Sequence, residues 1–441
     1  MNISSWLEDI EVSDAIETNP GQLLETRKRK RKPQQQQQTY TPAVSATDMN
    51  ISSEARSPSK RRRRDDPMDD IPDIDRTPRG RGSKAWSTSN RTGSDRSSTT
   101  STSRMSPTKH LSRLEVTGNP VVVAQITNTT NKRMPLELRI ILDELDGFQN
   151  RIGIVPKYLA EDIRARAEND HKFSRFSPST FEDNTTNSMD TESDPKLSLY
   201  DILKIFGSAI ECFEEDHAEA TWNTLVHWPV FELALGPIVD VVETDGQSYS
   251  REDRVRVRGM PCTAARLINR AHGSKMVDYC IFVEPKAQEA ERIAGIRAED
   301  YNINHTDYNP LRERPIVLSA ESKKPSEGGR NMQLQLGVWH AAQWAALEEL
   351  LGTRAETERP PAIPFLPALI IQDHDWSFAA STRSGNKTIL WSQQPIGTTA
   401  SLLGIFQLVR SLRHIGAWIR ESYWPWYRCA VLQLSGEDVS T

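Results

Sequence analysis

Short apolar runs and longer helical periodicities alternate along the second half of the chain. Two runs, residues 276–283 and 315–324, are rich in β-branched and aromatic residues and predict buried strands. After them, from Met332 to Leu351, apolar residues recur at helical spacing. Two strands followed by a long helix predict an α/β core in this part of the chain.

Further elements are predicted on both sides of this core. Residues 254–258 alternate strictly between polar and apolar and predict a small strand, and residues 366–371 predict a strand that continues the central sheet. Residues 376–380 and 387–391 predict a hairpin. Helical patterns occupy residues 197–210, 216–235 and 399–422. We therefore expect a central mixed sheet of four or five strands flanked by helices, in the order α-β-β-β-α-β.

Upstream of this body, residues 116–195 predict a helical arm and a linker. Leu138, Ile141, Leu142, Leu145 and Phe148 line one face of a helix. We expect two or three helices packed on the body; a helical arm that binds a partner is the competing interpretation. Residues 173–195 are rich in Ser, Thr, Asn and Asp and predict a mobile loop. Residues 196–441 form the expected folded domain.

Residues 1–115 have the composition of a disordered tail, because they contain too few apolar residues to offset chain entropy. Two basic clusters stand in this tail, from Arg27 to Lys32 and from Lys60 to Arg64. Such runs bind nuclear import receptors or nucleic acid, or are simply solvated charge. Two clusters in one tail favour import, so we expect a nuclear protein.

Charge and cysteine content narrow the function classes. Residues 1–115 hold 21 Lys and Arg against 16 Asp and Glu, and the remainder holds 34 against 44, so the body is acidic. An acidic body disfavours non-specific phosphate binding, which counts against a processive nuclease. The four cysteines show no zinc-binding spacing, and Cys280 and Cys429 are expected in the core. No apolar run has transmembrane length, so we expect an intracellular protein with no membrane partner.

The main chemical signal is that each of the two buried strands carries a carboxylate. A buried carboxylate is costly unless it is paired or binds a metal. Glu321 and Lys323 are two residues apart, so they lie on one face of their strand, and Asp278 lies near the start of the neighbouring strand. Carboxylates from adjacent strands can hold Mg²⁺, and a lysine beside them can position a water molecule.

These residues resemble the PD-(D/E)XK nuclease superfamily, and more narrowly a fungal group of PD-(D/E)XK nuclease-like domains. The resemblance spans roughly residues 197–432. Its ordered pieces begin at Glu219-Ala-Thr-Trp222-Asn223 and continue through Val277-Asp278-Tyr279, Glu321-Ser322-Lys323 and Gln335-Leu-Gly-Val-Trp339. One departure is that Ala320 and Ser322 replace the β-branched residues that usually surround this acid–lysine pair.

The resemblance implies a restriction-endonuclease-like core and metal-assisted hydrolysis of a phosphodiester. By this resemblance Glu219, Asp278 and Glu321 would hold Mg²⁺ or Mn²⁺, Lys323 would position the water, and Gln335 would orient the lysine or the water. Gln335 shares a helix face with Trp339, whereas Gln333 lies on another face and is the second choice. The expected substrate is nucleic acid, DNA rather than RNA.

Other interpretations remain open for individual residues and for the whole chain. Glu219 is equally well explained as a surface glutamate, and His227 is better explained as a core or surface histidine than as a ligand. The acidic group from Asp373 to Asp375 suits a turn better than a second metal site. The rival function is a catalytically inactive nuclease fold that acts as a chromatin or protein interaction module. A helical scaffold built on residues 116–167 has the least support.

Overall fold

A mixed β-sheet forms the centre of the computed structural model, which describes residues 106–126, 133–182, 196–237, 255–269, 276–324, 328–352 and 361–434. Within these residues the sheet has seven strands, in the order β1-β7-β6-β5-β4-β3-β2. The strands are β1 (Val121–Gln125), β2 (Arg256–Pro261), β3 (Tyr279–Glu284), β4 (Ile316–Lys323), β5 (Leu366–Gln372), β6 (Asp375–Ser384) and β7 (Lys387–Thr398). The β1–β7 and β4–β5 pairs are parallel, and the other neighbours are antiparallel.

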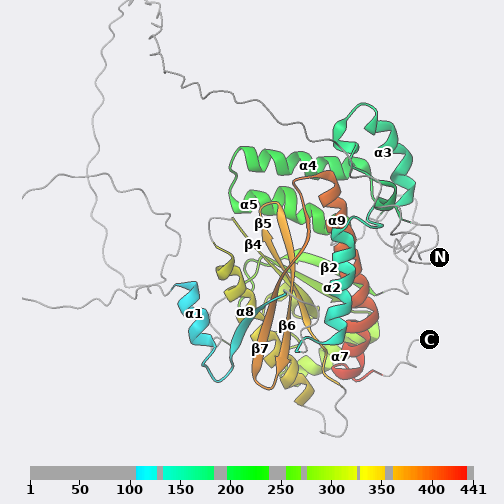
Figure 1. Ribbon diagram of the computed structural model, residues 1–441. Coiled ribbons are helices and arrows are strands. Elements are labelled where there is room, and N and C mark those ends of the chain that lie inside the picture. The colour runs from blue at the N-terminus through cyan, green and yellow to red at the C-terminus, as the bar shows by residue number, and fades with distance from the viewer. Residues whose placement is uncertain are drawn as a thin grey trace, which may run out of the picture. The chain divides into compact units, whose positions relative to one another are not determined.

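Helices cover both faces of this sheet (Figure 1). Helix α8 (Gly329–Gly352) crosses one face, and α1 (Pro107–Leu114) packs beside it. The other face is covered by α2 (Leu136–Gln149), α6 (Trp228–Leu235) and α9 (Leu402–Trp418). The buried apolar side chains accordingly fall into two clusters, one on each side of the sheet. A core on both sides of the sheet requires helices whose apolar faces pack on each face of the sheet.

The remaining helices are shorter or peripheral. They are α3 (Ala160–Ala167), α4 (Leu199–Glu214), α5 (Glu219–Trp222), α7 (Ala287–Ala298) and α10 (Trp424–Ala430). Helix α4 begins where the Ser198 side chain accepts a hydrogen bond from the Asp201 amide, as an N-cap should. A π-helical turn, Asn223–His227, joins α5 to α6. This turn matters because it points Asn223 toward the end of β4.

The predicted fold class is confirmed, and the order α-β-β-β-α-β is found from α6 through β2, β3, β4 and α8 to β5, with α7 inserted between β3 and β4. The predicted helix face in α2 is buried, from Leu138 to Phe148. The expected number of strands was wrong. The predicted hairpin joins β5 in the same sheet, and Val121–Gln125 form an additional strand, β1, in a region where only helices were expected.

Three further expectations were wrong in detail. Residues 107–114, assigned to the tail, form α1 and bury Leu111 against α8 and its neighbours. Phe173 and Phe181, assigned to a mobile loop, are buried. Cys280 is buried as expected, but Cys429 is exposed because it lies on the outer side of α10.

The basic clusters from Arg27 to Lys32 and from Lys60 to Arg64 lie outside the described residues, so the disordered tail and its import role remain predictions. Within the described part of the chain, every helix is too short or too polar to cross a bilayer.

Candidate active site

The antiparallel pairing of β3 and β4 brings two carboxylates together. Tyr279 pairs with Ala320, and the Asp278 amide donates to the Ala320 carbonyl at 3.0 Å. The next pair along this register is Asp278 beside Glu321. The two acids, 43 residues apart along the chain, therefore meet at the end of the sheet where β4 finishes and the chain turns toward α8.

Glu321 is the most deeply buried acid of the group, with 1% of its side chain exposed. Its Oε1 accepts a hydrogen bond from Gln335 Nε2 at 2.5 Å, whereas its buried Oε2 has no hydrogen-bond partner. Burial raises the pKa of Glu321 to about 8, and the negative charge of Asp278 adds to the rise. A carboxyl group with one unsatisfied buried oxygen and a raised pKa is poised to accept a proton or a cation.

Lys323 lies among three carboxylates. Its Nζ donates to Glu219 Oε1 at 2.8 Å, and it lies 3.1 Å from Glu321 Oε1 and 3.9 Å from Asp278 Oδ2. Burial alone would lower the pKa of this amine, but the charges of Glu321, Asp278 and Glu219 outweigh burial, so the pKa is raised. Lys323 is therefore a firmly charged ammonium that neutralises part of the acidic cluster.

Glu219 reaches this cluster from the first turn of α5. Its side chain is 28% exposed, and its carboxylate hydrogen-bonds to the ammonium of Lys323. The structure thus brings five predicted residues together, and they are called the acid–lysine cluster: Glu219, Asp278, Glu321, Lys323 and Gln335. In the structure Glu219 is the hydrogen-bond partner of Lys323. This is in addition to the ligand role that the resemblance implies.

Asp278 is held by Ser322, which was not among the predicted site residues. Its Oδ2 lies 2.8 Å from the Ser322 amide and 2.9 Å from Ser322 Oγ. Ser322 Oγ also lies 2.8 Å from Oδ1 of Asn223. A polar residue near the end of a buried strand, between Glu321 and Lys323, was the available signal for Ser322. The position of Asn223 depends on the tertiary fold.

Several other candidate residues lie away from the acid–lysine cluster. Gln333 Nε2 donates to Ser392 Oγ at 3.1 Å, so it belongs to the packing between α8 and β7. His227 is buried and lies 2.8 Å from both Asn223 Oδ1 and the Asp373 carbonyl oxygen. Burial lowers the pKa of His227 to about 4. Asp373 and His374 form the tight turn between β5 and β6, where Asp373 has φ 48°.

Two carboxylates of the cluster, Asp278 and Glu321, are suitable ligands for a hard divalent cation. Among the described residues, no group of three or more His, Cys, Asp or Glu is arranged as a preformed metal site, and the Lys323 ammonium lies among the carboxylates. Glu321 Oε2, however, is a buried carboxylate oxygen without a hydrogen-bond donor. Carboxylate oxygens are the ligands that Mg²⁺ and Mn²⁺ prefer. Asp278 and Glu321 therefore fit such an ion.

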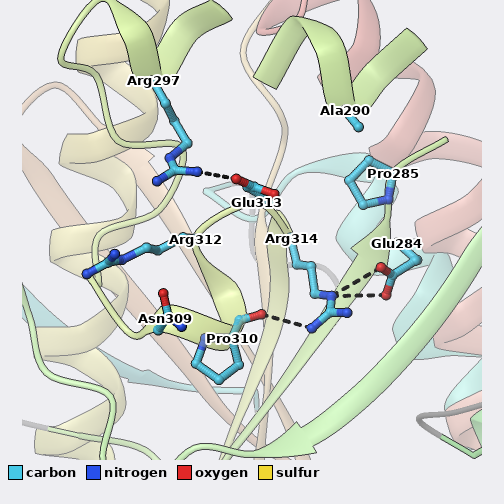
Figure 2. Close-up of a pocket in the computed structure, with 9 residues that line it drawn as sticks. All are labelled: Glu284, Pro285, Ala290, Arg297, Asn309, Pro310, Arg312, Glu313 and Arg314. Carbon is cyan, nitrogen blue, oxygen red and sulfur yellow. Dashed lines mark hydrogen bonds and ion pairs between the residues drawn. The ribbon is translucent and has the colours of Figure 1, made fainter. Parts of the chain in front are cut away.

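A separate pocket of about 420 Å³ opens at the opposite end of β3 and β4 (Figure 2). It contains three guanidinium groups, but Arg314 Nε lies 3.1 Å from the Glu284 carboxylate and Arg297 pairs with Glu313. Only Arg312 contributes a positive charge that is not matched by a carboxylate in the pocket. The pocket is thus close to neutral, and the acid–lysine cluster remains the candidate active site.

Comparison with known protein families gives a match over much of the described body. A family model described as the PD-(D/E)XK nuclease superfamily matches residues 163–424, which is more than half of the chain. The matched range includes all five residues of the acid–lysine cluster. No curated protein and no solved structure matches the chain.

Proposed function

The chain belongs to the PD-(D/E)XK nuclease superfamily, and from this premise we propose that it is a metal-dependent phosphodiester hydrolase acting on nucleic acid. The observation that carries the proposal is the convergence of Asp278, Glu321 and Lys323 at the end of β4, with one oxygen of Glu321 buried and unsatisfied. Such an oxygen is costly to bury unless a cation or a proton occupies it.

In this proposal Asp278 and Glu321 hold Mg²⁺ or Mn²⁺, with Glu219 as a third candidate ligand. When bound, the ion supplies Lewis-acid charge that stabilises negative charge developing on the phosphate. Gln335 fixes Glu321 by donating to its Oε1, so that Oε2 keeps a constant direction. This hydrogen bond supports an orienting role for Gln335 that acts on Glu321, whereas the resemblance implies one that acts on the lysine or the water.

Lys323 provides the positive charge that the chain itself contributes. Its ammonium has three N–H donors, and Glu219 and the Ser322 carbonyl, both at 2.8 Å, accept two of them. The third donor faces Glu321 at 3.1 Å. With Glu321 committed to a cation, this donor would be available to position the attacking water or to stabilise charge on the phosphate.

The rival proposal is a catalytically inactive nuclease fold that serves as a chromatin or protein interaction module. One observation favours it: the Lys323 ammonium already lies within 4 Å of all three carboxylates, as a bound cation would. In an inactive protein this internal ion-pair network would be purely structural.

A cleavage assay separates the two proposals. Purified protein is incubated with labelled DNA or RNA and Mg²⁺ or Mn²⁺, beside Asp278→Ala and Lys323→Ala. Ser319→Ala is the matched control, because Ser319 is a buried residue of β4 that hydrogen-bonds to Trp339 rather than to the cluster. Metal-dependent cleavage by the wild type and the control, lost in both cluster variants, supports the hydrolase. Absence of wild-type cleavage with every metal and substrate supports the inactive fold.

We also propose that DNA is the preferred substrate and that the protein acts in the nucleus. Two basic clusters, from Arg27 to Lys32 and from Lys60 to Arg64, support the nuclear location, because they resemble the motifs that nuclear import receptors bind. A fluorescent fusion tests the location. Replacing both clusters by neutral residues should move the fusion out of the nucleus, and an unchanged nuclear signal would contradict the assignment.

A further inference from the structure

A chain of buried and half-buried polar side chains leads away from Asp278 Oδ2, the oxygen that also lies 3.9 Å from Lys323 Nζ. Ser322 lies between Glu321 and Lys323, so strand alternation turns its side chain to the other face of β4. There its hydroxyl lies 2.9 Å from Asp278 Oδ2 and 2.8 Å from Asn223 Oδ1. Asn223 in turn lies 2.8 Å from His227 Nδ1. Asp278 is thus connected, through Ser322, to the π-helical turn before α6.

The number of available protons fixes the direction of these hydrogen bonds. A serine hydroxyl has one proton, so it cannot donate to both Asp278 and an amide oxygen. A neutral His227 has one N–H, and its Nε2 lies 2.8 Å from the Asp373 carbonyl, which can only accept. His227 Nδ1 must then accept a proton from Asn223. The nitrogen and oxygen of an amide occupy equivalent positions and are assigned by such a network.

One arrangement of protons satisfies these contacts of Ser322, Asn223 and His227. The Asn223 amide group presents its NH₂, which donates one proton to His227 Nδ1 and the other to Ser322 Oγ. The Ser322 hydroxyl is then free to donate to Asp278 Oδ2, beside the bond from its own backbone amide. Fully satisfied buried networks of this kind fix one geometry, because any rotation leaves a buried group unpaired.

Asn223 is also held through its backbone, and its partner His227 is enclosed. The hydroxyl of Tyr279, the residue after Asp278, donates to the backbone carbonyl oxygen of Asn223 at 3.0 Å. His227 is completely enclosed, between Trp222 and Trp376. The network therefore ties the carboxylate of Asp278 to the π-helical turn that contains the enclosed His227.

We propose that Ser322 and Asn223 are positioning residues for Asp278, which hold its Oδ2 so that Oδ1 faces a cation bound with Glu321. This inference rests on the proposed metal-dependent function. Among the described residues no hydrogen bond to Asp278 Oδ1 is found, so this oxygen is the one left for the ion. Groups that orient a ligand in this way contribute strongly to metal affinity.

Mn²⁺ titration by calorimetry of the full chain tests the proposal. Ser322→Ala and Asn223→Ala should each raise the Kd for Mn²⁺ by about 10-fold. Their effects should not add in the double variant, because both act through the same carboxylate. Cleavage by either variant should recover at high Mn²⁺. A merely structural role would not produce this metal-dependent recovery.

Ser319→Ala is again the matched control. Ser319 and Ser322 lie on the same strand, and both are fully buried. Ser319→Ala removes a comparable hydrogen bond, the one that Ser319 Oγ accepts from Trp339 Nε1 at 2.9 Å. Its Mn²⁺ affinity should stay within about twofold of the wild type, since it has no link to the site. An unchanged Kd in Ser322→Ala, or an equal loss in Ser319→Ala, would overturn the positioning role.

A second measurement needs no metal. Nitrogen NMR of the ¹⁵N-histidine-labelled protein should show His227 neutral at pH 7, with the proton on Nε2. Its Nδ1 resonance should shift in Asn223→Ala. A protonated Nδ1 in the wild type would refute the network whatever the metal does. A wild type that binds no Mn²⁺ while His227 has the expected tautomer would refute the proposed function and leave the network intact, so the two failures are distinguishable.

Discussion

Replacing Glu321 by Gln should change how the stability of the metal-free protein depends on pH. The substitution keeps the shape of the side chain and the hydrogen bond from Gln335, but it removes the titratable group. In the wild type the pKa of Glu321 is raised to about 8 from 4.5, chiefly because the group is buried. Its side chain is 1% exposed, so solvent screening does little to reduce the effect.

The sign and size of the effect follow from proton linkage. A raised pKa means that the folded state binds a proton that the unfolded state has released, so wild-type stability falls as pH rises from the unfolded value toward about 8. Each pH unit in this window costs about 1.4 kcal/mol. Between pH 5 and pH 8 the free energy of unfolding of the wild type should therefore fall by on the order of 4 kcal/mol relative to Glu321→Gln.

Urea unfolding followed by tryptophan fluorescence, in the presence of a chelator, measures this difference at each pH. Glu211→Gln is the control, since Glu211 is an exposed residue of α4. That substitution should leave the pH dependence as in the wild type. The difference between Glu321→Gln and the wild type should widen steadily up to pH 8 and then level off. Parallel curves for these two proteins would refute the claim that burial keeps Glu321 protonated.

Three further predictions follow from the same geometry. Lys323→Met should reduce single-turnover cleavage by at least about 100-fold, while Mn²⁺ affinity measured by calorimetry rises, because the ammonium no longer competes for the carboxylates; weaker Mn²⁺ binding would contradict this. Mn²⁺ binding to the wild type at pH 7 should release about one proton, since Glu321 must ionise, and calorimetry in two buffers with different ionisation enthalpies counts it; no release would contradict the raised pKa. Gly404→Ala should lower the melting temperature by several degrees, because a Cβ there would lie 2.1 Å from the Thr398 carbonyl oxygen. Gly207→Ala, where a Cβ meets nothing within 4 Å, should not destabilise the protein, and equal losses would contradict the packing at Gly404.

The site was predictable where a local rule decides the geometry. Strand alternation is such a rule, and it places Glu321 and Lys323 on one face whatever surrounds them. Helical spacing separates Gln335 from Gln333 in the same way, and only Gln335 reaches Glu321. The short apolar run after Asp278 predicts a strand, and antiparallel pairing then sets Asp278 beside Glu321.

What the sequence could not supply depends on contacts between distant segments. Strand β1 is only five residues long and pairs with β7, more than 260 residues away, so its three valines give a weak local signal within a helical region. The Ser322–Asn223 contact joins residues 99 positions apart. The position of Lys323 among three carboxylates likewise depends on α5, which delivers Glu219 from outside the sheet.

The most direct test of the central claim is the anomalous scattering of Mn²⁺ in crystals of the full chain. Crystals are soaked at an Mn²⁺ concentration that supports cleavage, and Asp278→Asn crystals serve as the control. The proposed site predicts a peak bonded to both Asp278 and Glu321 in the wild type, with Lys323 displaced from Glu321 and no peak in the control. A wild-type map without that peak, in which Lys323 still contacts all three carboxylates, would contradict the claim that this cluster is a metal-dependent active site.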